Sequence, residues 1–284
     1  MQERRLLEII DFGDLPVFAE ATTYPCILSW QNTAPTGTFR AANVEELRPD
    51  DFVDYLPTIT YDSLQEALKP EGWTLADVPT QRLLDKLQQT GTTLGDYVDG
   101  EIYYGIKTGL NEAFVIDAAT REQLLAEDPR SAEVIKPFLA GRDIKRYVPP
   151  RAEKLLILFP KGWTREQWGD LDEATAFAKI QTDYPAIAHH LNPFAEKGRK
   201  RYDKGEYWWD LRACDYYEEF AREKIIIPAI VKEPSYSFDR KGIYSNDKTS
   251  IIPTDDLSLL ALLNSKTVNF CATANFFNET RRVL

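Results

Sequence analysis

The chain has 284 residues, of which 43% are hydrophobic and 12% aromatic, enough to fill the core of one large domain or two smaller ones. No apolar run approaches the ~20 residues of a membrane span, and the first residues lack a signal peptide, so we expect a cytoplasmic protein. The three cysteines are odd in number and far apart, which argues against a disulfide framework or a paired-cysteine metal site.

Formal charge is distributed unevenly along the chain, and this bears on its partners. The net charge is -11 at pH 7, but residues 1–100 hold 7 basic against 17 acidic side chains, whereas residues 101–284 hold 27 against 28. The densest basic segment, KGRKRYDK at residues 197–204, carries five positive charges and one negative. A nucleic-acid partner needs such a cluster, but an ordinary solvated loop has the same composition, so charge alone leaves both interpretations open.

The first 100 residues contain predicted strands and then short helices. Strand-like runs at residues 9–12 and 23–29, separated by turn residues, predict a hairpin or a pair of adjacent strands. Two strands alone are marginal in water, and we expect no sheet partner for them before residue 100. An acidic, polar connector follows, with short helices expected at residues 43–47, 61–68 and 78–89, the last capped by Thr80.

A turn-rich segment at residues 90–100 predicts a domain boundary, after which a second domain begins. Apolar runs at residues 102–106 and 113–116 flank a polar turn at residues 107–111, which predicts a hairpin with an exposed tip. The later predicted elements are helices at residues 120–125, 131–139, 184–192 and 255–277, and buried strands at residues 154–159, 224–231 and 250–252.

Two runs in the second domain carry a family resemblance. The GIKTGLNEAF run at residues 105–114 and the GRDIKRY run at residues 141–147 resemble, in this order, the target-recognition domain of TaqI-like adenine-specific DNA methyltransferases and their type IIG restriction-modification relatives. The DFGDLPVF run at residues 11–18 resembles the segment that closes the catalytic sheet of these enzymes.

This resemblance implies an α+β fold in three parts. Residues 1–34 would be the last strands of a Rossmann-like methyltransferase sheet, and residues 35–99 an acidic helical connector. Residues 100–284 would form a mixed DNA target-recognition domain with a long C-terminal helix, and the chain is expected to stop before the end of that domain.

The resemblance implies sequence-specific recognition of double-stranded DNA without methyl transfer. An adenine methyltransferase needs a glycine-rich loop for S-adenosylmethionine and an Asn-Pro-Pro-aromatic loop for a flipped base, and the sequence has neither. The nearest match, Asn192-Pro193-Phe194, lacks the second proline and is interpreted as a helix-ending turn. S-adenosylmethionine is therefore expected in a catalytic domain of the same protein outside this chain, which alone would be inactive. The whole would be a restriction-modification or phage-defence methyltransferase.

Direct readout of DNA needs Arg, Lys, Asn or Gln side chains that reach base edges, while other cations hold the phosphates. Trp208 and Trp209 are interpreted first as core anchors and second as residues that stack on an exposed base or sugar. The other candidate DNA contacts lie at the predicted hairpin tip (Lys107, Thr108, Asn111), beside it (Arg142, Arg146) and in the basic segment (Lys197, Arg199, Lys200, Arg201).

Two other classes of function stay open. A Mg²⁺-dependent nuclease needs an Asp and, further along, an acidic residue closely followed by a Lys; Asp143-Ile144-Lys145 has that spacing, with Asp50 as a distant partner. The adjacent histidines 189 and 190 point to different sides of a helix, which argues against a shared metal site. The acidic first third would suit a protein-interaction module of a phage-defence complex, which would bind without a steep salt dependence.

Overall fold

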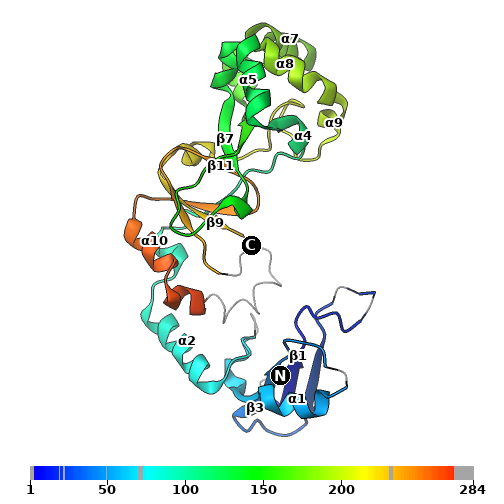
Figure 1. The fold of residues 1–284 in the computed structure, drawn as a ribbon, viewed down its shortest axis with the longest axis vertical. Helices are drawn as coiled ribbons and strands as arrows, with labels where there is room; N and C mark the ends of the chain where they lie inside the picture. Colours follow the sequence, from blue (N-terminus) through cyan, green and yellow to red (C-terminus); the bar gives the residue numbers. More distant parts are fainter. Residues whose placement is uncertain are drawn as a thin grey trace. The chain divides into compact units, whose positions relative to one another are not determined.

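The computed structural model describes residues 3–18, 20–21, 23–48, 50–69, 73–229 and 233–271. Its contacts divide the chain into two compact units: unit 1 is Met1–Thr93 with Lys266–Leu284, and unit 2 is Leu94–Ser265 (Figure 1). Each unit combines helices with β-sheet, so the fold class is α+β. Among the described residues, no helix is both long enough and apolar enough to cross a membrane.

A four-stranded mixed sheet forms the body of unit 1, in the order β2-β1-β3-β4. Strand β1 pairs antiparallel with β2 and parallel with β3, and β4 pairs antiparallel with β3. The predicted pairing of the first two strands is confirmed, whereas the prediction that they lack a partner before residue 100 is wrong. The bounds are β1 (Arg5–Asp11), β2 (Cys26–Gln31), β3 (Thr38–Asn43) and β4 (Thr60–Leu64).

Both faces of this sheet are covered by apolar side chains. A β-bulge between Leu6 and Glu8 shifts the alternation of β1, so that Leu6 and Ile9 pack into one cluster while Ile10 packs into another. Helix α1 (Phe52–Ile59) adds the Phe52 ring to the second cluster, 5.8 Å from the ring of Phe12. The strand pair is therefore anchored by residues that the sequence assigned to a separate connector.

Two of the three helices expected in the connector are absent from the described residues. Residues 61–68 form most of β4 and one 3-10 turn, η1 (Gln65–Ala67), and residues 43–47 end β3 and continue as loop. The aromatic Tyr61 fits the pleated edge that β3 offers, and pairing with that edge outweighs the local helical pattern.

The third expected helix of the connector is confirmed as α2 (Val78–Thr90). Its N-cap is Asp77 rather than the predicted Thr80, because the Asp77 carboxylate accepts a hydrogen bond from the Thr80 backbone N–H at 2.8 Å. The cap side chain thus satisfies one of the free N–H groups at the start of α2.

Unit 2 contains two four-stranded sheets, in the orders β10-β9-β12-β5 and β11-β7-β8-β6. Strands β7 and β8 are antiparallel, as are β9 and β12, while β11 runs parallel to β7. The bounds are β5 (Tyr103–Tyr104), β6 (Val115–Ile116), β7 (Ile135–Leu139), β8 (Lys154–Ile157), β9 (Lys224–Pro228), β10 (Ser237–Asp239), β11 (Tyr244–Ser245) and β12 (Thr249–Pro253).

Helices cover one end of unit 2, where α5, α7 and α8 lie together above β7 and β11 (Figure 1). Ile180 of α7 and Ile187 of α8 are fully buried in one continuous core with Phe114 and Phe159. The helices are α3 (Leu94–Tyr97), α4 (Asn111–Phe114), α5 (Ala118–Glu127), α6 (Trp163–Trp168), α7 (Glu173–Asp183), α8 (Pro185–Leu191), α9 (Ala195–Lys200) and α10 (Leu257–Leu263), with 3-10 turns η2 (Pro129–Glu133), η3 (Gly141–Asp143), η4 (Asn192–Phe194) and η5 (Tyr217–Ala221).

The predicted helix at residues 131–139 is wrong, because Ile135–Leu139 is strand β7 in the middle of a sheet. Pro137 disfavours a helix interior, and β8 and β11 supply partners on both sides. The predictions of α5, α8, β8, β9 and β12 are confirmed within a few residues at each end, and residue 231, the expected end of β9, lies outside the described residues.

The long C-terminal helix expected at residues 255–277 is interrupted. Helix α10 ends at Leu263, and a separate helical segment occupies residues 266–271. The cause lies at Asn264, which is fully buried and exchanges two hydrogen bonds with the backbone of Tyr236, at 3.1 and 3.0 Å. Residues 272–277 lie outside the described part of the chain.

Candidate nucleic-acid interface

The polar turn at residues 107–111 is not the tip of a hairpin. The apolar runs on either side of it join different sheets, because β5 pairs with β12 and β6 pairs with β8. Within the turn, the Thr108 hydroxyl is buried and donates to the Asn111 side-chain oxygen at 2.5 Å, while the backbone N–H of Leu110 donates to that hydroxyl at 3.3 Å. Thr108 and Asn111 therefore shape the turn, and Lys107 is its exposed cation.

A second turn, at residues 201–203, is clamped against this one. Lys107 forms an ion pair with Asp203 at 2.9 Å, a contact that lowers the pKa of the Asp203 carboxyl. The Arg201 guanidinium donates to the carbonyl oxygens of Thr108, Trp208 (2.8 Å) and Asp210 (2.7 Å), and lies 4.7 Å from the centre of the Phe114 ring. Arg201 is 8% exposed, and burial lowers its pKa. The donors of Arg201, which was predicted as a phosphate contact, hold the two turns together.

The remaining cations of the basic segment lie on the surface of α9 and the turn after it. Lys197 pairs with Glu112 at 2.8 Å and Arg199 with Glu173 at 2.7 Å, and all four side chains are largely exposed. Lys200 is also exposed. Exposed ion pairs contribute little net free energy, so Lys197 and Arg199 can leave their carboxylate partners at small cost.

Trp208 and Trp209 are core residues, with 1% and 0% of their surface exposed. The Phe177 ring lies 5.2 Å from the ring of Trp208 and 5.3 Å from that of Trp209, and the indole N–H of Trp209 donates to the Thr164 hydroxyl at 3.0 Å. The first interpretation of these tryptophans, as core anchors, agrees with this placement. In this conformation the rings of Trp208 and Trp209 lie inside the core of unit 2.

A strongly basic loop connects β7 to β8. Arg142, Lys145, Arg146 and Arg151 are all exposed, and the Arg142 side chain is 89% exposed. The loop is nevertheless fixed at several points. The Asp143 carboxylate accepts a hydrogen bond from the backbone N–H of Ala140 at 3.1 Å, and the side chains of Ile144 and Pro150 are buried. We call residues 142–151 the basic loop.

The tip of the basic loop has an unusual backbone. Tyr147 adopts φ +61°, in the left-handed region that favours glycine, and the residue is 64% exposed. The Arg146 guanidinium lies 4.8 Å from the centre of the Tyr147 ring and donates to its hydroxyl at 3.2 Å. Directly after the tip, the carbonyl oxygen of Val148 accepts a hydrogen bond from the Ser237 hydroxyl at 2.6 Å.

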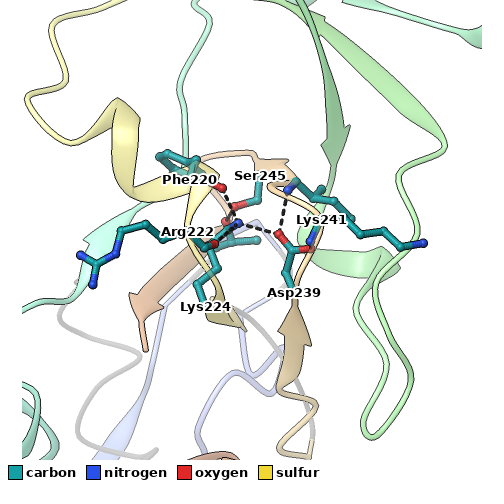
Figure 2. A network of polar contacts seen from close by, with 8 residues as sticks. Phe220, Arg222, Lys224, Asp239, Lys241 and Ser245 are labelled. Atoms are coloured by element: carbon teal, nitrogen blue, oxygen red, sulfur yellow. Dashed lines mark hydrogen bonds and ion pairs between the residues drawn. The ribbon is translucent and has the colours of Figure 1, made fainter. Parts of the chain in front are cut away.

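Ser237 pairs with Ile226 in the β10–β9 ladder, and two residues further along β10 Asp239 forms a buried ion pair, shown in Figure 2. The Lys224 ammonium of β9 lies 2.5 Å from the Asp239 carboxylate of β10, and both side chains are almost fully buried. Lys224 also donates to the carbonyl oxygen of Phe220 at 2.5 Å, and Asp239 accepts from the backbone N–H of Ile243 at 2.7 Å. Burial lowers the pKa of Lys224, and the contact with Asp239 opposes that fall. The pair fixes β10, whose first residue is Ser237.

Among the described residues, no group of three or more His, Cys, Asp or Glu side chains is placed to hold a metal ion. The Asp143 carboxylate of the nuclease pattern accepts the Ala140 N–H and lies 3.8 Å from Arg142. His190 is half-buried with Nε2 3.0 Å from the carbonyl oxygen of Ala113, while the side chain of His189 is 82% exposed. The two histidines therefore face different surroundings, as predicted.

Sequence reasoning named Arg142 and Arg146 as candidate DNA contacts and did not include three exposed neighbours on the same loop: Lys145, Tyr147 and Arg151. The GRDIKRY run already contained two of them. Pro149 and Pro150 are the sequence feature that predicts this loop, because prolines disfavour both helices and central strands. The cations near them are then expected in an exposed connection.

Comparison with known proteins places the sequence in a family. The model of the TaqI-like C-terminal specificity domain matches residues 136–283, slightly more than half of the chain, and includes the basic loop and α9. No curated protein matches the chain. Solved structures that resemble it include the type IIL restriction-modification enzyme MmeI in complex with DNA (11% identity, TM-score 0.48, 94% of this chain and 32% of that one) and the type IIG restriction endonuclease BpuSI (10% identity, TM-score 0.33, 92% and 32%).

The chain spans about a third of the length of these two solved chains. The family match rests on sequence and covers most of unit 2. The chain therefore belongs to the family of TaqI-like C-terminal specificity domains.

Proposed function

We propose that this chain recognises double-stranded DNA as the specificity part of a restriction-modification enzyme, either an adenine-specific methyltransferase or a type IIG enzyme. The observation that carries the proposal is the family match, because the matched residues contain both exposed basic segments of unit 2. Specificity in such an enzyme is the choice of a DNA sequence. Because the chain has a net charge of -11, it can bind DNA phosphates only where its cations are clustered.

The basic loop supplies the centre of the proposed interface. Arg142, Lys145, Arg146 and Arg151 stand against a single carboxylate in the loop, that of Asp143, which is already engaged by the Ala140 N–H. Guanidinium groups bind phosphates and the guanine edge in two-point geometry, so Arg142 and Arg146 suit either kind of contact.

A second group of cations would extend the interface over phosphates. Lys107, Lys197 and Arg199 are exposed and held in surface ion pairs that phosphates can replace, and Lys200 is exposed beside them. Asn111 shapes its turn through Thr108. Because they are buried, Thr108, Arg201, Trp208 and Trp209 are left out of the proposed interface.

Methyl transfer would belong to a catalytic domain of the same protein, which would bind S-adenosylmethionine. In this proposal residues 1–34 contribute strands to the Rossmann-like sheet of that domain, together with β3 and β4 of residues 35–99, which pair with them in one sheet. The rest of residues 35–99 is the connector, and residues 100–284 recognise DNA. The glycine-rich and Asn-Pro-Pro-aromatic loops that methyl transfer needs are missing from this sequence, which supports assigning the chain to recognition. Defence against phage is the role we propose for the whole enzyme.

The test is fluorescence anisotropy of a labelled random-sequence duplex, titrated with the full chain at rising salt. We expect binding at low salt that weakens steeply, because each phosphate contact contributes about 0.9 to the log–log slope. A loop variant should lose affinity and slope, whereas a matched control with four other exposed cations changed should keep both. The loop variant carries Arg142→Gln, Lys145→Gln, Arg146→Gln and Arg151→Gln, and the control carries Arg82→Gln, Lys161→Gln, Lys179→Gln and Lys241→Gln.

Absence of binding at low salt, or binding that does not respond to salt, would refute the proposal for this chain. Salt-independent binding of a protein partner would instead favour the interaction-module interpretation. Cleavage of the duplex that requires Mg²⁺ and disappears in Asp143→Ala would favour the nuclease.

A further inference from the structure

We propose that Tyr147 is a base-stacking residue, whose ring packs on a nucleobase that is exposed from its duplex stack. The inference deepens the proposed function and rests on it, because it names the chemical group that the tip of the basic loop contacts. Three features of the tip carry it: the backbone of Tyr147, the exposure of its ring, and the cations around it.

The backbone of Tyr147 is held in a conformation that a tyrosine disfavours. Its φ of +61° brings Cβ too close to the neighbouring carbonyl oxygen, and among the described residues other than glycine such a value is shared only with Asp99 (φ +52°). Residues of this kind persist where the surroundings force them, and they gather at functional sites. A glycine would adopt this backbone without strain.

The strain does not serve packing, because the ring is directed away from the core. Ile144 and Pro150 on either side of the tip are buried, whereas Tyr147 is 64% exposed. The Ser237 hydroxyl fixes the carbonyl oxygen of Val148, the residue after it, at 2.6 Å. These buried residues and this hydrogen bond therefore hold the loop with the Tyr147 ring exposed to solvent.

The surroundings of the ring select a nucleic acid as its ligand. Arg146 lies 4.8 Å from the ring centre, and the loop holds three further exposed cations. A flat aromatic face beside cations matches the alternation of base and phosphate along a nucleic-acid strand, where stacking depends little on base identity. A protein partner with an acidic surface would use the cations but would not need an exposed, strained ring.

The experiment compares the full chain with Tyr147→Gly and Tyr147→Phe on two labelled probes, a random-sequence duplex and an oligothymidine single strand. The Gly variant removes the ring and relieves the backbone, and the Phe variant keeps the ring. We expect Tyr147→Gly to lower affinity for the single strand by about 5- to 150-fold, with its salt slope unchanged, and Tyr147→Phe to bind like the wild type. The melting temperature of Tyr147→Gly should stay the same or rise.

Asp99→Gly is the matched control, because it relieves a positive φ in an exposed residue outside the basic loop. It should leave affinity for both probes unchanged. Equal binding of both probes by wild type and Tyr147→Gly would overturn the inference while leaving the proposed function intact. A loss of affinity in Tyr147→Gly that accompanies a fall in melting temperature, and is shared by Tyr147→Phe, would assign a structural role and also overturn it. Absence of duplex binding by the wild type would overturn both proposals.

Discussion

Lys224 and Asp239 form a buried ion pair at 2.5 Å that lies two residues from Ser237, the residue that holds the tip of the basic loop. Each partner also engages the backbone: Lys224 contacts two carbonyl oxygens, and Asp239 accepts from two N–H groups. An internal charge pair and an exposed loop are therefore connected through the short strand β10, so changes at the pair have consequences at the surface.

Removing one partner of this pair should destabilise the chain strongly. Lys224→Met leaves the Asp239 carboxylate buried without a counterion, which we expect to cost about 3–5 kcal/mol in the free energy of unfolding by urea. The double variant Lys224→Met/Asp239→Asn should recover much of this loss because no buried charge remains. As a control, Arg222→Ala breaks a more exposed pair with Glu219 and should cost no more than about 1 kcal/mol. If Lys224→Met were as stable as Arg222→Ala, the buried ion pair would not contribute to stability as expected.

The buried cation Arg201 and the exposed cations Lys197 and Arg199 should differ in their effects on stability and on DNA binding when both are measured. Arg201→Lys cannot reach all three carbonyl oxygens, so we expect a loss of about 3 kcal/mol in unfolding free energy. Lys197→Ala/Arg199→Ala should stay within about 1 kcal/mol of the wild type but bind DNA with a smaller salt slope. If Arg201→Lys were as stable as the wild type and deficient only in DNA binding, the assignment of Arg201 as a buried structural residue would be wrong.

Stability should depend on pH through Asp210. Burial raises the pKa of its carboxyl to about 6, against hydrogen bonds from the Tyr207 N–H and the Thr164 hydroxyl that lower it. The folded state then binds the proton more tightly than the unfolded state, whose carboxyl has a pKa near 4, so the contribution is present at low pH and lost as pH rises from about 4 to about 6. The change amounts to about 3 kcal/mol at most.

Thermal unfolding of Asp210→Asn across this pH range tests the assignment, because the variant should lack that decline. Asp172→Asn is a control of opposite sign, since hydrogen bonds from Thr175 lower the pKa of Asp172, and the stability it contributes is lost as pH falls. Parallel pH profiles for the wild type and Asp210→Asn would mean that folding does not shift the pKa of Asp210.

Gly105, just before the polar turn, has no room for a side chain. A Cβ there would overlap the carbonyl oxygen of Asn246, so Gly105→Ala requires the backbone to move and should cost about 1–3 kcal/mol. Gly95→Ala is the matched control, because Gly95 lies in helix α3 with open space around it, and this change should be neutral or stabilising by up to about 1 kcal/mol. Differential scanning fluorimetry compares the melting temperatures of the two variants. Equal values would show that the backbone around Gly105 moves to accommodate a Cβ at little cost in stability.

The sequence predicted elements whose signal is local. The apolar run of β8 and the proline-started helix α8 carry their own pattern, and both were found. Strands β5 and β6 are two residues long, and each pairs with a strand that lies far away in the chain. Because the sequence shows only that the two apolar runs flank a turn, they were predicted as the two strands of a hairpin. Strand β7 was predicted as helix for the same reason, since its neighbours β8 and β11 decide its conformation.

The candidate site shows a similar limit for charge. Composition identified the basic segment, but it does not say which cations face carbonyl oxygens inside the fold and which face solvent. Arg201 and Arg199 are two residues apart, yet one is buried and the other forms a surface pair with Glu173. Only the position of the turn after α9 separates them, and that position depends on Gly109 and Phe114, far earlier in the chain.

The pairing of Tyr104 in β5 with Ser250 in β12 constrains the order in which unit 2 acquires its structure. The two residues lie near opposite ends of the unit, so during synthesis β5 waits for almost all of the intervening chain before its ladder can form. Helices α5, α7 and α8 have near neighbours and can pack earlier. The turn at residues 107–111, although it emerges from the ribosome early in the synthesis of the unit, is thus among the last parts of the unit to be fixed.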